Sequence, residues 1–307
     1  MKKPIRLGTR GSPLALIQAE MVKTALMEAD DNLKEPGALD VVVVSTTGDR
    51  VTDRPLADIG GKGLFCKEIE MALFEGRIDC GVHSMKDMPT WLPDGLVIAS
   101  MLPRADPRDV LISRKADSIK GLPEGAVVGT ASLRRQAQIL ARRPDLKVIN
   151  FRGSVGTRLQ KLDEGQVDAT MLARAGLDRL ALEDVPQSVL SPEEMLPAVG
   201  QGVIGIECRG DDNELLTLFA QIDHGPTSAC VHAERAMLDV LDGSCHTPIG
   251  AYALLDGGQM HLRGLVARPD GSECFETARF GSVDEGLDLG RDAGEELRSR
   301  GGKELFA

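Results

Sequence analysis

Two adjacent arginines lie at the predicted junction between a strand and the helix that follows it. Ser132 is a predicted N-cap, which places Arg134 and Arg135 in the first turn of the helix that follows. Positive side chains are disfavoured there by roughly 0.3–1 kcal/mol each, because the helix dipole is positive at its N-terminus. The pair therefore favours an anion bound at that end of the helix. Three further arginines lie at a similar turn or beside a glycine-rich one: Arg10, Arg152 and Arg158.

The chemistry of these arginines restricts their ligand. A guanidinium group binds carboxylates and phosphates through two parallel hydrogen bonds. We expect neither a G-x-x-x-x-G-K-[ST] phosphate loop nor a G-x-G-x-x-G pattern in this chain, which disfavours nucleotide chemistry. The sequence therefore predicts a site for a polycarboxylate or polyphosphate. The alternative is that the arginines are solvated surface charges.

One aspartate and one cysteine stand out as candidates for chemistry. Asp87 lies in VHSMKDMPT (82–90), directly after a predicted strand, and loops at strand ends carry function in α/β proteins. Cys245 lies in the polar loop GSCHTPIG (243–250), where the neighbouring His246 could favour the reactive thiolate. The alternatives are an aspartate that forms a turn and an inert loop cysteine. The spacing of cysteines and histidines predicts no metal site.

Short apolar runs that alternate with helical patterns must position these residues. Asp40–Ser45 and Ala126–Gly129 are predicted to be buried strands. Helices are predicted over Met21–Glu28, Lys67–Phe74 and Gln136–Arg142. This alternation predicts α/β units with sheets rich in parallel strands.

Two pairs of similar segments predict an internal duplication. LGTRGSPLAL (7–16) resembles VGTASLRRQAQIL (128–140), and FEGRIDCGVH (74–83) resembles DEGQVDATML (163–172). We expect two similarly built lobes with a ligand cleft between them, beyond the carboxyl ends of the strands.

Proline-rich boundaries and the later part of the chain predict three domains. The capping box Ser191–Glu194 (SPEE) predicts the start of a helix. Beyond residue 225, helical patterns and alternating strands predict a small α+β domain. The predicted boundaries are 1–102 with 203–220 for domain 1, 108–196 for domain 2 and 225–307 for domain 3.

Composition limits the classes of partner and compartment. The net charge of −11 opposes binding to nucleic acid or to an anionic membrane, and the 3% aromatic content opposes recognition by stacking. No signal-peptide pattern and no apolar run near 18 residues are visible. We expect a cytoplasmic protein with free thiols, and neither nucleic acid nor membrane as a partner.

Seven strings resemble the porphobilinogen deaminase family in order and spacing, over nearly the whole chain. They are LGTRGSPLAL, GGKGLFCKEIE, VHSMKDMPT, VGTASLRRQAQIL, FRGSVGTRLQKL, PAVGQGVIGIECR and GSCHTPIGAYA. The resemblance implies an α/β fold of two periplasmic-binding-protein-like lobes with mixed sheets around a cleft, plus a small α+β C-terminal domain. It also implies a monomer.

The same resemblance implies the reaction and the cofactor. Members join four porphobilinogen units head to tail with loss of ammonia, on a dipyrromethane cofactor, and then release hydroxymethylbilane by hydrolysis. By position, Cys245 matches the cysteine that holds this cofactor through a thioether. Asp87 matches the carboxylate that hydrogen-bonds the pyrrole N–H groups and stabilises the cation left when ammonia departs.

The remaining residues at family positions fall into two sets. The cofactor-binding set comprises Ser84, Lys86, Asp87, Thr130, Ser132, Arg134, Arg135 and Asp49. The substrate-binding set comprises Arg10, Ser12, Gln18, Phe65, Arg152, Arg158, Arg179 and Gln201. Because each pyrrole carries acetate and propionate groups, the growing chain is the polycarboxylate that the arginines predict.

Two departures from the family pattern remove no motif group. Ser244 stands where glycine is usual, and Ala131 stands where serine is frequent. Two other functions remain as alternatives. A non-catalytic anion-binding module of the periplasmic type would explain the lobes and the arginines, but it leaves Asp87 and Cys245 without a role. A nucleotide-dependent transferase would lack its phosphate loop.

Overall fold

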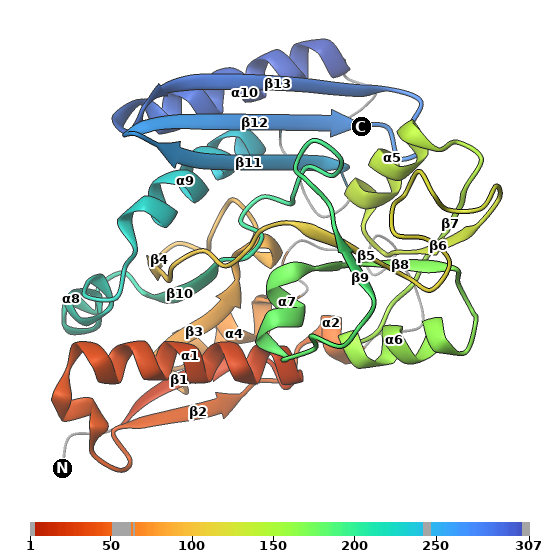
Figure 1. Ribbon diagram of the computed structural model, residues 1–307. Coiled ribbons are helices and arrows are strands. Elements are labelled where there is room, and N and C mark those ends of the chain that lie inside the picture. The colour runs from red at the N-terminus through yellow and green to blue at the C-terminus, as the bar shows by residue number, and fades with distance from the viewer. Residues whose placement is uncertain (1–3, 51–62, 64, 242–246, 303–307) are drawn as a thin grey trace. The chain divides into compact units, whose positions relative to one another are not determined.

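The computed structural model describes residues 4–50, 63, 65–241 and 247–302 (Figure 1). The described residues form two compact units. The first comprises those of 4–50, 63–105 and 203–228, and the second those of 106–202 and 229–302. Each unit is built around its own sheets and hydrophobic core.

A mixed five-stranded sheet forms the first unit. Its strand order is β2 (Leu39–Val43), β1 (Ile5–Thr9), β3 (Cys80–Ser84), β10 (Ile204–Arg209) and β4 (Leu96–Met101). Strands β2, β1 and β3 are parallel, whereas β10 is antiparallel to both of its neighbours. The helices that pack on this sheet are α1 (Pro13–Ala29), α4 (Lys67–Phe74) and α8 (Asn213–Ala220), and the short α2 covers Thr47–Arg50.

A second mixed five-stranded sheet lies in the second unit. Its order is β7 (Lys147–Ile149), β6 (Val127–Gly129), β8 (Ala169–Ala173), β5 (Asp109–Ser113) and β9 (Gln187–Val189). Strands β7, β6 and β8 are parallel, and β5 is antiparallel to both β8 and β9. The accompanying helices are α5 (Leu133–Arg142), α6 (Val155–Asp163) and α7 (Arg174–Arg179).

The two five-stranded sheets share one topology, which confirms the predicted duplication. Each has three parallel strands followed by two strands whose pairings are antiparallel, in the same spatial order. The registers also match, because Leu7 pairs with Cys80 in the first sheet and Val128 pairs with Ala169 in the second. The similar sequence segments are therefore the β1–α1 and β6–α5 units and the strands β3 and β8.

The glycine of the repeated apolar-Gly-Thr string has a steric reason in both copies. A Cβ atom on Gly8 would lie 2.3 Å from the Ile78 side chain, and one on Gly129 would lie 2.6 Å from the Phe151 ring. Real Cβ atoms do not approach so closely, so a larger residue would displace a core side chain. The motif therefore marks a place where the strand passes directly beneath an apolar side chain.

The C-terminal part of the second unit is a three-stranded antiparallel sheet with helices. The strands are β11 (Ile249–Asp256), β12 (Gln259–Ala267) and β13 (Cys274–Ser282). Helix α10 (Gly286–Gly301) packs along β12 and β13, and α9 (Gly225–Val240) leads into this region (Figure 1). The mixed α/β sheets and the small α+β portion confirm the predicted fold class.

Most predicted elements are present, but two predictions about them were wrong. Asp40–Ser45 was expected to be a buried strand, yet β2 is an edge strand and Val43 is 57% exposed. The capping box at Ser191–Glu194 does form, with Ser191 N donating to Glu194 Oε2 and Glu194 N donating to Ser191 Oγ. No helix follows it, because Pro197 lacks the N–H that the next turn would need.

A close approach between α9 and α10 gives a prediction for stability. A Cβ atom on Gly290 would lie 2.2 Å from the backbone oxygen of Ala233. We expect Gly290→Ala to lower the free energy of unfolding by roughly 1–3 kcal/mol, because the backbone must shift to relieve the overlap. Urea titration of the purified chain measures this difference.

Gly156→Ala is the matched control for this prediction. Gly156 also lies in a helix, α6, but a Cβ there meets nothing within 4 Å. Alanine should leave stability unchanged or raise it by about 0.5–1 kcal/mol through helix propensity. Equal destabilisation by both substitutions would show that the α9–α10 contact is not the cause.

Candidate functional site

The segment around Asp87 lies just beyond the carboxyl end of β3. Strand β3 ends at Ser84, and the single 3-10 turn Met85–Asp87 follows it. Met85 is 1% exposed and its N–H donates to the Val203 carbonyl, which anchors the turn to the sheet. Lys86 and Asp87 are therefore held at a fixed place beyond the carboxyl end of β3, with both side chains partly exposed.

Five of the predicted site residues line one pocket of the first unit. Arg10 and Gln18 come from the β1–α1 segment, Phe65 precedes α4, and Ser84 and Asp87 come from the end of β3. Its full lining is Arg10, Ala15, Gln18, Phe65, Cys66, Val82, His83, Ser84, Asp87 and Met88. Residues far apart in the sequence thus converge on a space with a carboxylate, a guanidinium and an aromatic ring.

Contacts inside this pocket orient the polar groups. The Arg10 guanidinium lies over the Phe65 ring, 4.0 Å from its centroid, and its Nη1 is 3.9 Å from Asp87 Oδ2. Gln18 Nε2 donates to Ser84 Oγ at 2.8 Å. Because Arg10 and Asp87 are 23% and 34% exposed at their side chains, both can still reach a ligand.

Ser12 has a structural role in the described residues. Its side chain is the N-cap of α1 and accepts a hydrogen bond from Ala15 N at 3.3 Å. Such a cap satisfies an N–H group that the helix itself leaves unpaired. Ser12 therefore fixes the start of the helix that carries Gln18.

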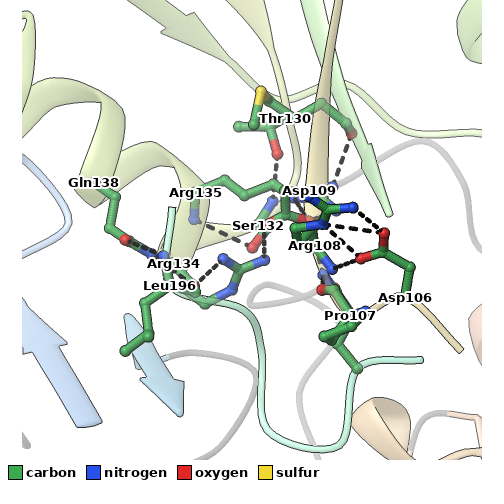
Figure 2. Close-up of polar contacts among 12 residues, drawn as sticks. Asp106, Pro107, Arg108, Asp109, Thr130, Ser132, Arg134, Arg135, Gln138 and Leu196 are labelled. Atoms are coloured by element: carbon green, nitrogen blue, oxygen red, sulfur yellow. Dashed lines mark hydrogen bonds and ion pairs between the residues drawn. The ribbon is translucent and has the colours of Figure 1, made fainter. Parts of the chain in front are cut away.

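A second group of predicted residues converges on a buried carboxylate in the second unit (Figure 2). Asp109 Oδ2 accepts from Arg134 Nη2 at 2.7 Å, and Asp109 Oδ1 accepts from Arg135 Nη2 at 2.7 Å. Gln201 Nε2 donates to the same Oδ1 at 2.9 Å. We call these four residues the Asp109 cluster. Asp109 is fully buried, and the exposed fractions of Arg134 and Arg135 are only 5% and 6%.

Charge pairing dominates the electrostatics of this cluster. Burial alone would raise the pKa of Asp109, but the two guanidinium groups hold that pKa well below its usual value. Burial lowers the pKa of Arg134, opposed by the nearby Asp109. The cluster therefore keeps its carboxylate ionised through the ordinary pH range.

The structure gives Arg134 and Arg135 a partner that the sequence did not suggest. Ser132 caps α5 and accepts from Arg135 N, as predicted, and Thr130 Oγ1 accepts from Ser132 N at 3.1 Å. The expected anion was an external ligand, whereas the guanidinium groups already bind the protein's own Asp109. Asp109 opens a strand in DPRDVLIS, and a charged residue at the start of an apolar run was the available signal.

Gln201 lies in a glycine-rich turn whose glycines are spaced as in a nucleotide-binding pattern. The string GQGVIG (200–205) does have the spacing G-x-G-x-x-G, so the prediction that this pattern is absent was wrong. In a dinucleotide fingerprint this pattern follows a strand and opens a helix. Here it leads into strand β10, so it is not such a fingerprint.

The other predicted arginines hold backbone groups in the second unit. Arg158 Nε donates to the Gly153 carbonyl at 2.9 Å, which braces the turn before α6. Arg179 Nη2 donates to the Gly202 carbonyl at 2.8 Å, and burial lowers the pKa of this arginine. The side chain of Arg152 is half-buried beside the same turn as Arg158.

Two predicted residues lie wholly or partly outside what the structure describes. Cys245 falls within 242–246, which the structure does not describe. For Asp49 the structure describes the backbone, in α2, but not the side chain. Other cysteines are poor nucleophiles: burial raises the pKa of Cys66 and Cys80, and raises that of Cys208 to about 11.

A buried histidine–glutamate pair next to the pocket was missed by the sequence analysis. His83 Nε2 and Glu207 Oε2 are 3.0 Å apart, and the residues are 6% and 0% exposed. The available signal was a polar residue within each of two apolar strands, VHS and IECR. The pair joins β3 to β10 behind the Asp87 turn.

Comparison with known proteins identifies the family of this chain. Residues 5–217 match the family model for the porphobilinogen deaminase dipyromethane cofactor binding domain, and residues 228–299 match the model for the porphobilinogen deaminase C-terminal domain. The chain belongs to the porphobilinogen deaminase family. A chloroplastic porphobilinogen deaminase of Oryza sativa subsp. japonica is 54% identical over 98% of this chain and 85% of that protein. The porphobilinogen deaminase of Paracoccus denitrificans is 52% identical over 99% of this chain and 97% of that protein.

Solved structures of binding proteins are also similar, at a lower level. The periplasmic aliphatic sulphonate binding protein of Escherichia coli has a TM-score of 0.42 at 15% identity, over 78% of this chain and 70% of that one. Similarity of this degree adds nothing to the sheet order and register described above.

Membership of the deaminase family confirms the predicted reaction and cofactor. The chain is a transferase that condenses four porphobilinogen units head to tail with loss of ammonia, on a covalently held dipyrromethane. The alternative of a non-catalytic anion-binding module is therefore set aside. Within the part of the chain that the structure describes, no helix is long and apolar enough to cross a membrane.

Proposed function

We propose that this member of the deaminase family forms each new bond in the pocket that contains Asp87, Arg10 and Phe65. The observation that carries this proposal is the convergence of these three residues with Gln18 and Ser84 on one pocket. A carboxylate 3.9 Å from a guanidinium can face the cationic carbon left by ammonia while the guanidinium holds a substrate carboxylate.

Asp87 has two tasks in this proposal. Its carboxylate accepts hydrogen bonds from pyrrole N–H groups, and it stabilises positive charge at the reacting carbon. It also accepts and returns the proton that moves from the pyrrole carbon to the departing ammonia, so that no proton is gained or lost in each addition. Arg10, stacked over Phe65, positions the substrate and shields that face of the pocket from water.

The dipyrromethane fits the residues at the predicted cofactor positions. When bound, this group supplies the electron-rich terminal pyrrole on which the product grows. Its carboxylates need cationic partners, and Arg134 Nε is buried with no hydrogen-bond partner among the described residues. We assign Cys245 as its thioether anchor, with binding by Ser84, Lys86, Asp87, Thr130, Ser132, Arg134, Arg135 and Asp49.

The substrate and the growing chain are assigned to the second set of residues. This set comprises Arg10, Ser12, Gln18, Phe65, Arg152, Arg158, Arg179 and Gln201. Ser12 and Gln201 act by holding other groups, because they cap α1 and bind Asp109 respectively. The arginines act by pairing with acetate and propionate groups.

We also infer the setting in which the enzyme works. The net charge of −11 supports a protein that binds neither nucleic acid nor an anionic membrane. We propose a cytoplasmic location, and a monomer by resemblance to the family. The three-domain division at 1–102 with 203–220, 108–196 and 225–307 belongs to the same proposal.

The intact mass of the purified chain tests the proposed function. We expect a mass above that of the sequence by two pyrrole units, and further increments of one unit each when porphobilinogen is added. Ammonia should be released in a ratio of one per porphobilinogen consumed. A chain that stays at its sequence mass, even after incubation with porphobilinogen, would contradict the proposal.

A further inference from the structure

Asp109 is an ionised side chain in a fully buried position. It is the first residue of β5, has no exposed surface, and lies between two arginines that are themselves at least nine-tenths buried. Carboxylates are almost never fully buried unless they are paired, because leaving water is costly. The cluster is therefore a built arrangement of charges and not a surface ion pair.

The two oxygens of Asp109 hold different residues. Oδ1 accepts from Arg135 Nε at 3.2 Å, Arg135 Nη2 at 2.7 Å and Gln201 Nε2 at 2.9 Å. Oδ2 accepts from Arg134 Nη2 at 2.7 Å (Figure 2). Each arginine has a second anchor on the backbone: Arg134 Nη1 donates to the Leu196 carbonyl, and Arg135 Nη1 donates to the Met171 carbonyl.

The cluster is left with charge and hydrogen-bonding capacity for a ligand. One carboxylate faces two guanidinium groups, so the three side chains together carry a formal charge of +1. The buried Arg134 Nε has no partner among the described residues, whereas both nitrogen atoms beyond it are bonded. Asp109 therefore binds both arginines, but Arg134 is the one whose buried Nε has no hydrogen-bond partner among the described residues.

We propose that Asp109 is a positioning residue for the carboxylate-binding arginines, and that its Oδ2 holds the Arg134 guanidinium in place for a carboxylate of the dipyrromethane. Asp109 does not touch the ligand in this proposal and acts through Arg134. The inference rests on the proposed function, because it presupposes that Arg134 binds the cofactor.

Asp109→Asn separates the two halves of this arrangement. Three donors converge on Oδ1, so the amide oxygen of asparagine should take that place and keep Arg135 and Gln201 bound. The amide NH2 then occupies the place of Oδ2 and faces Arg134 Nη2, donor against donor. The variant should therefore release Arg134 while leaving the Arg135 side of the cluster in place.

The experiment is a double-mutant cycle read by intact mass. Asp109→Asn, Arg134→Gln and the double variant are purified, their folded fractions are collected, and the share of chains that carry two pyrrole units is measured. We expect each single variant to lower the ratio of loaded to unloaded chains by roughly tenfold, the effect of losing one charged hydrogen bond. The double variant should be no worse than Arg134→Gln alone, because Asp109 acts through that arginine.

Two further variants make the cycle specific. Asp109→Asn combined with Arg135→Gln should lower the ratio below that of either single variant, because the first substitution releases Arg134 and the second removes the other guanidinium. Asp106→Asn is the matched control: Asp106, three residues before Asp109, pairs with Arg108, and both side chains are partly exposed. It should change loading by less than about twofold, as is usual for exposed ion pairs.

Three outcomes would overturn the proposal. They are normal loading of folded Asp109→Asn, multiplicative effects of Asp109→Asn and Arg134→Gln, and a fall in thermal midpoint with no change in loading, which would show a merely structural role.

If Asp109→Asn does not fold, Asp109→Glu replaces it: this variant keeps the charge but displaces the carboxylate by one methylene. Reduced loading of folded Asp109→Glu supports the proposal, and normal loading overturns it. A wild-type chain that carries no pyrrole units would instead contradict the proposed function itself.

Discussion

Replacing Asp87 with alanine is expected to lower kcat by roughly 10²–10⁴-fold while the protein stays folded. This range is typical for the loss of a positioned acid–base group. The carboxylate lies in the pocket beside Arg10 and Phe65, and its removal leaves no other acidic side chain among the described residues that line this pocket. Steady-state rates of hydroxymethylbilane formation measure the effect.

The fold should tolerate this substitution for a structural reason. The Asp87 side chain is 34% exposed, and its ion pair with Arg10 is long at 3.9 Å. Such a pair contributes at most about 1 kcal/mol to stability. The turn itself is anchored by the buried Met85 and its bond to Val203, which the substitution does not touch.

Asp94→Ala provides the matched control for Asp87→Ala. Asp94 is an exposed aspartate of the same unit, in the loop before β4, and it does not line the pocket. Its replacement should leave kcat within about twofold of the wild type. Near-normal turnover of Asp87→Ala, with cofactor content verified by mass, would refute the role assigned to Asp87.

The second large effect is expected at Cys245. Cys245→Ser should purify at its sequence mass, without the two pyrrole units, and should have no measurable turnover. Serine keeps the size of the side chain but replaces the sulfur, and an alkoxide is much harder to form at neutral pH than a thiolate. Intact mass before and after incubation with porphobilinogen measures the attachment directly.

Cys274→Ser is the control for this substitution. Cys274 is a half-buried free cysteine in β13 whose pKa is raised by burial and by nearby Glu276. Its replacement should leave the two-pyrrole mass and the turnover unchanged. A normal cofactor on Cys245→Ser, retained after denaturation, would move the anchor to another residue.

The chemistry of the site could be predicted from the sequence because it follows from local patterns. The apolar-Gly-Thr strings and the Glu-Gly-x-x-Asp segments occur twice, and the shared order of the two five-stranded sheets follows from this repetition. Strand ends were also visible, which is why Asp87 was expected just after β3. Residue type and spacing within about ten residues are sufficient for such inferences.

The partners of these residues were decided only by the tertiary structure. Asp109 and Arg134 are 25 residues apart in the sequence, and His83 and Glu207 are 124 apart. No periodicity links such positions, because pairing across a sheet depends on strand order and register. The strand that contains Asp40 proved to be an edge strand for the same reason. The missing helix after Ser191 has instead a local cause, Pro197. Local sequence determined which groups this protein has and where its strands end, whereas the packing of distant segments decided which charges meet, because burial makes an unpaired charge too costly to keep.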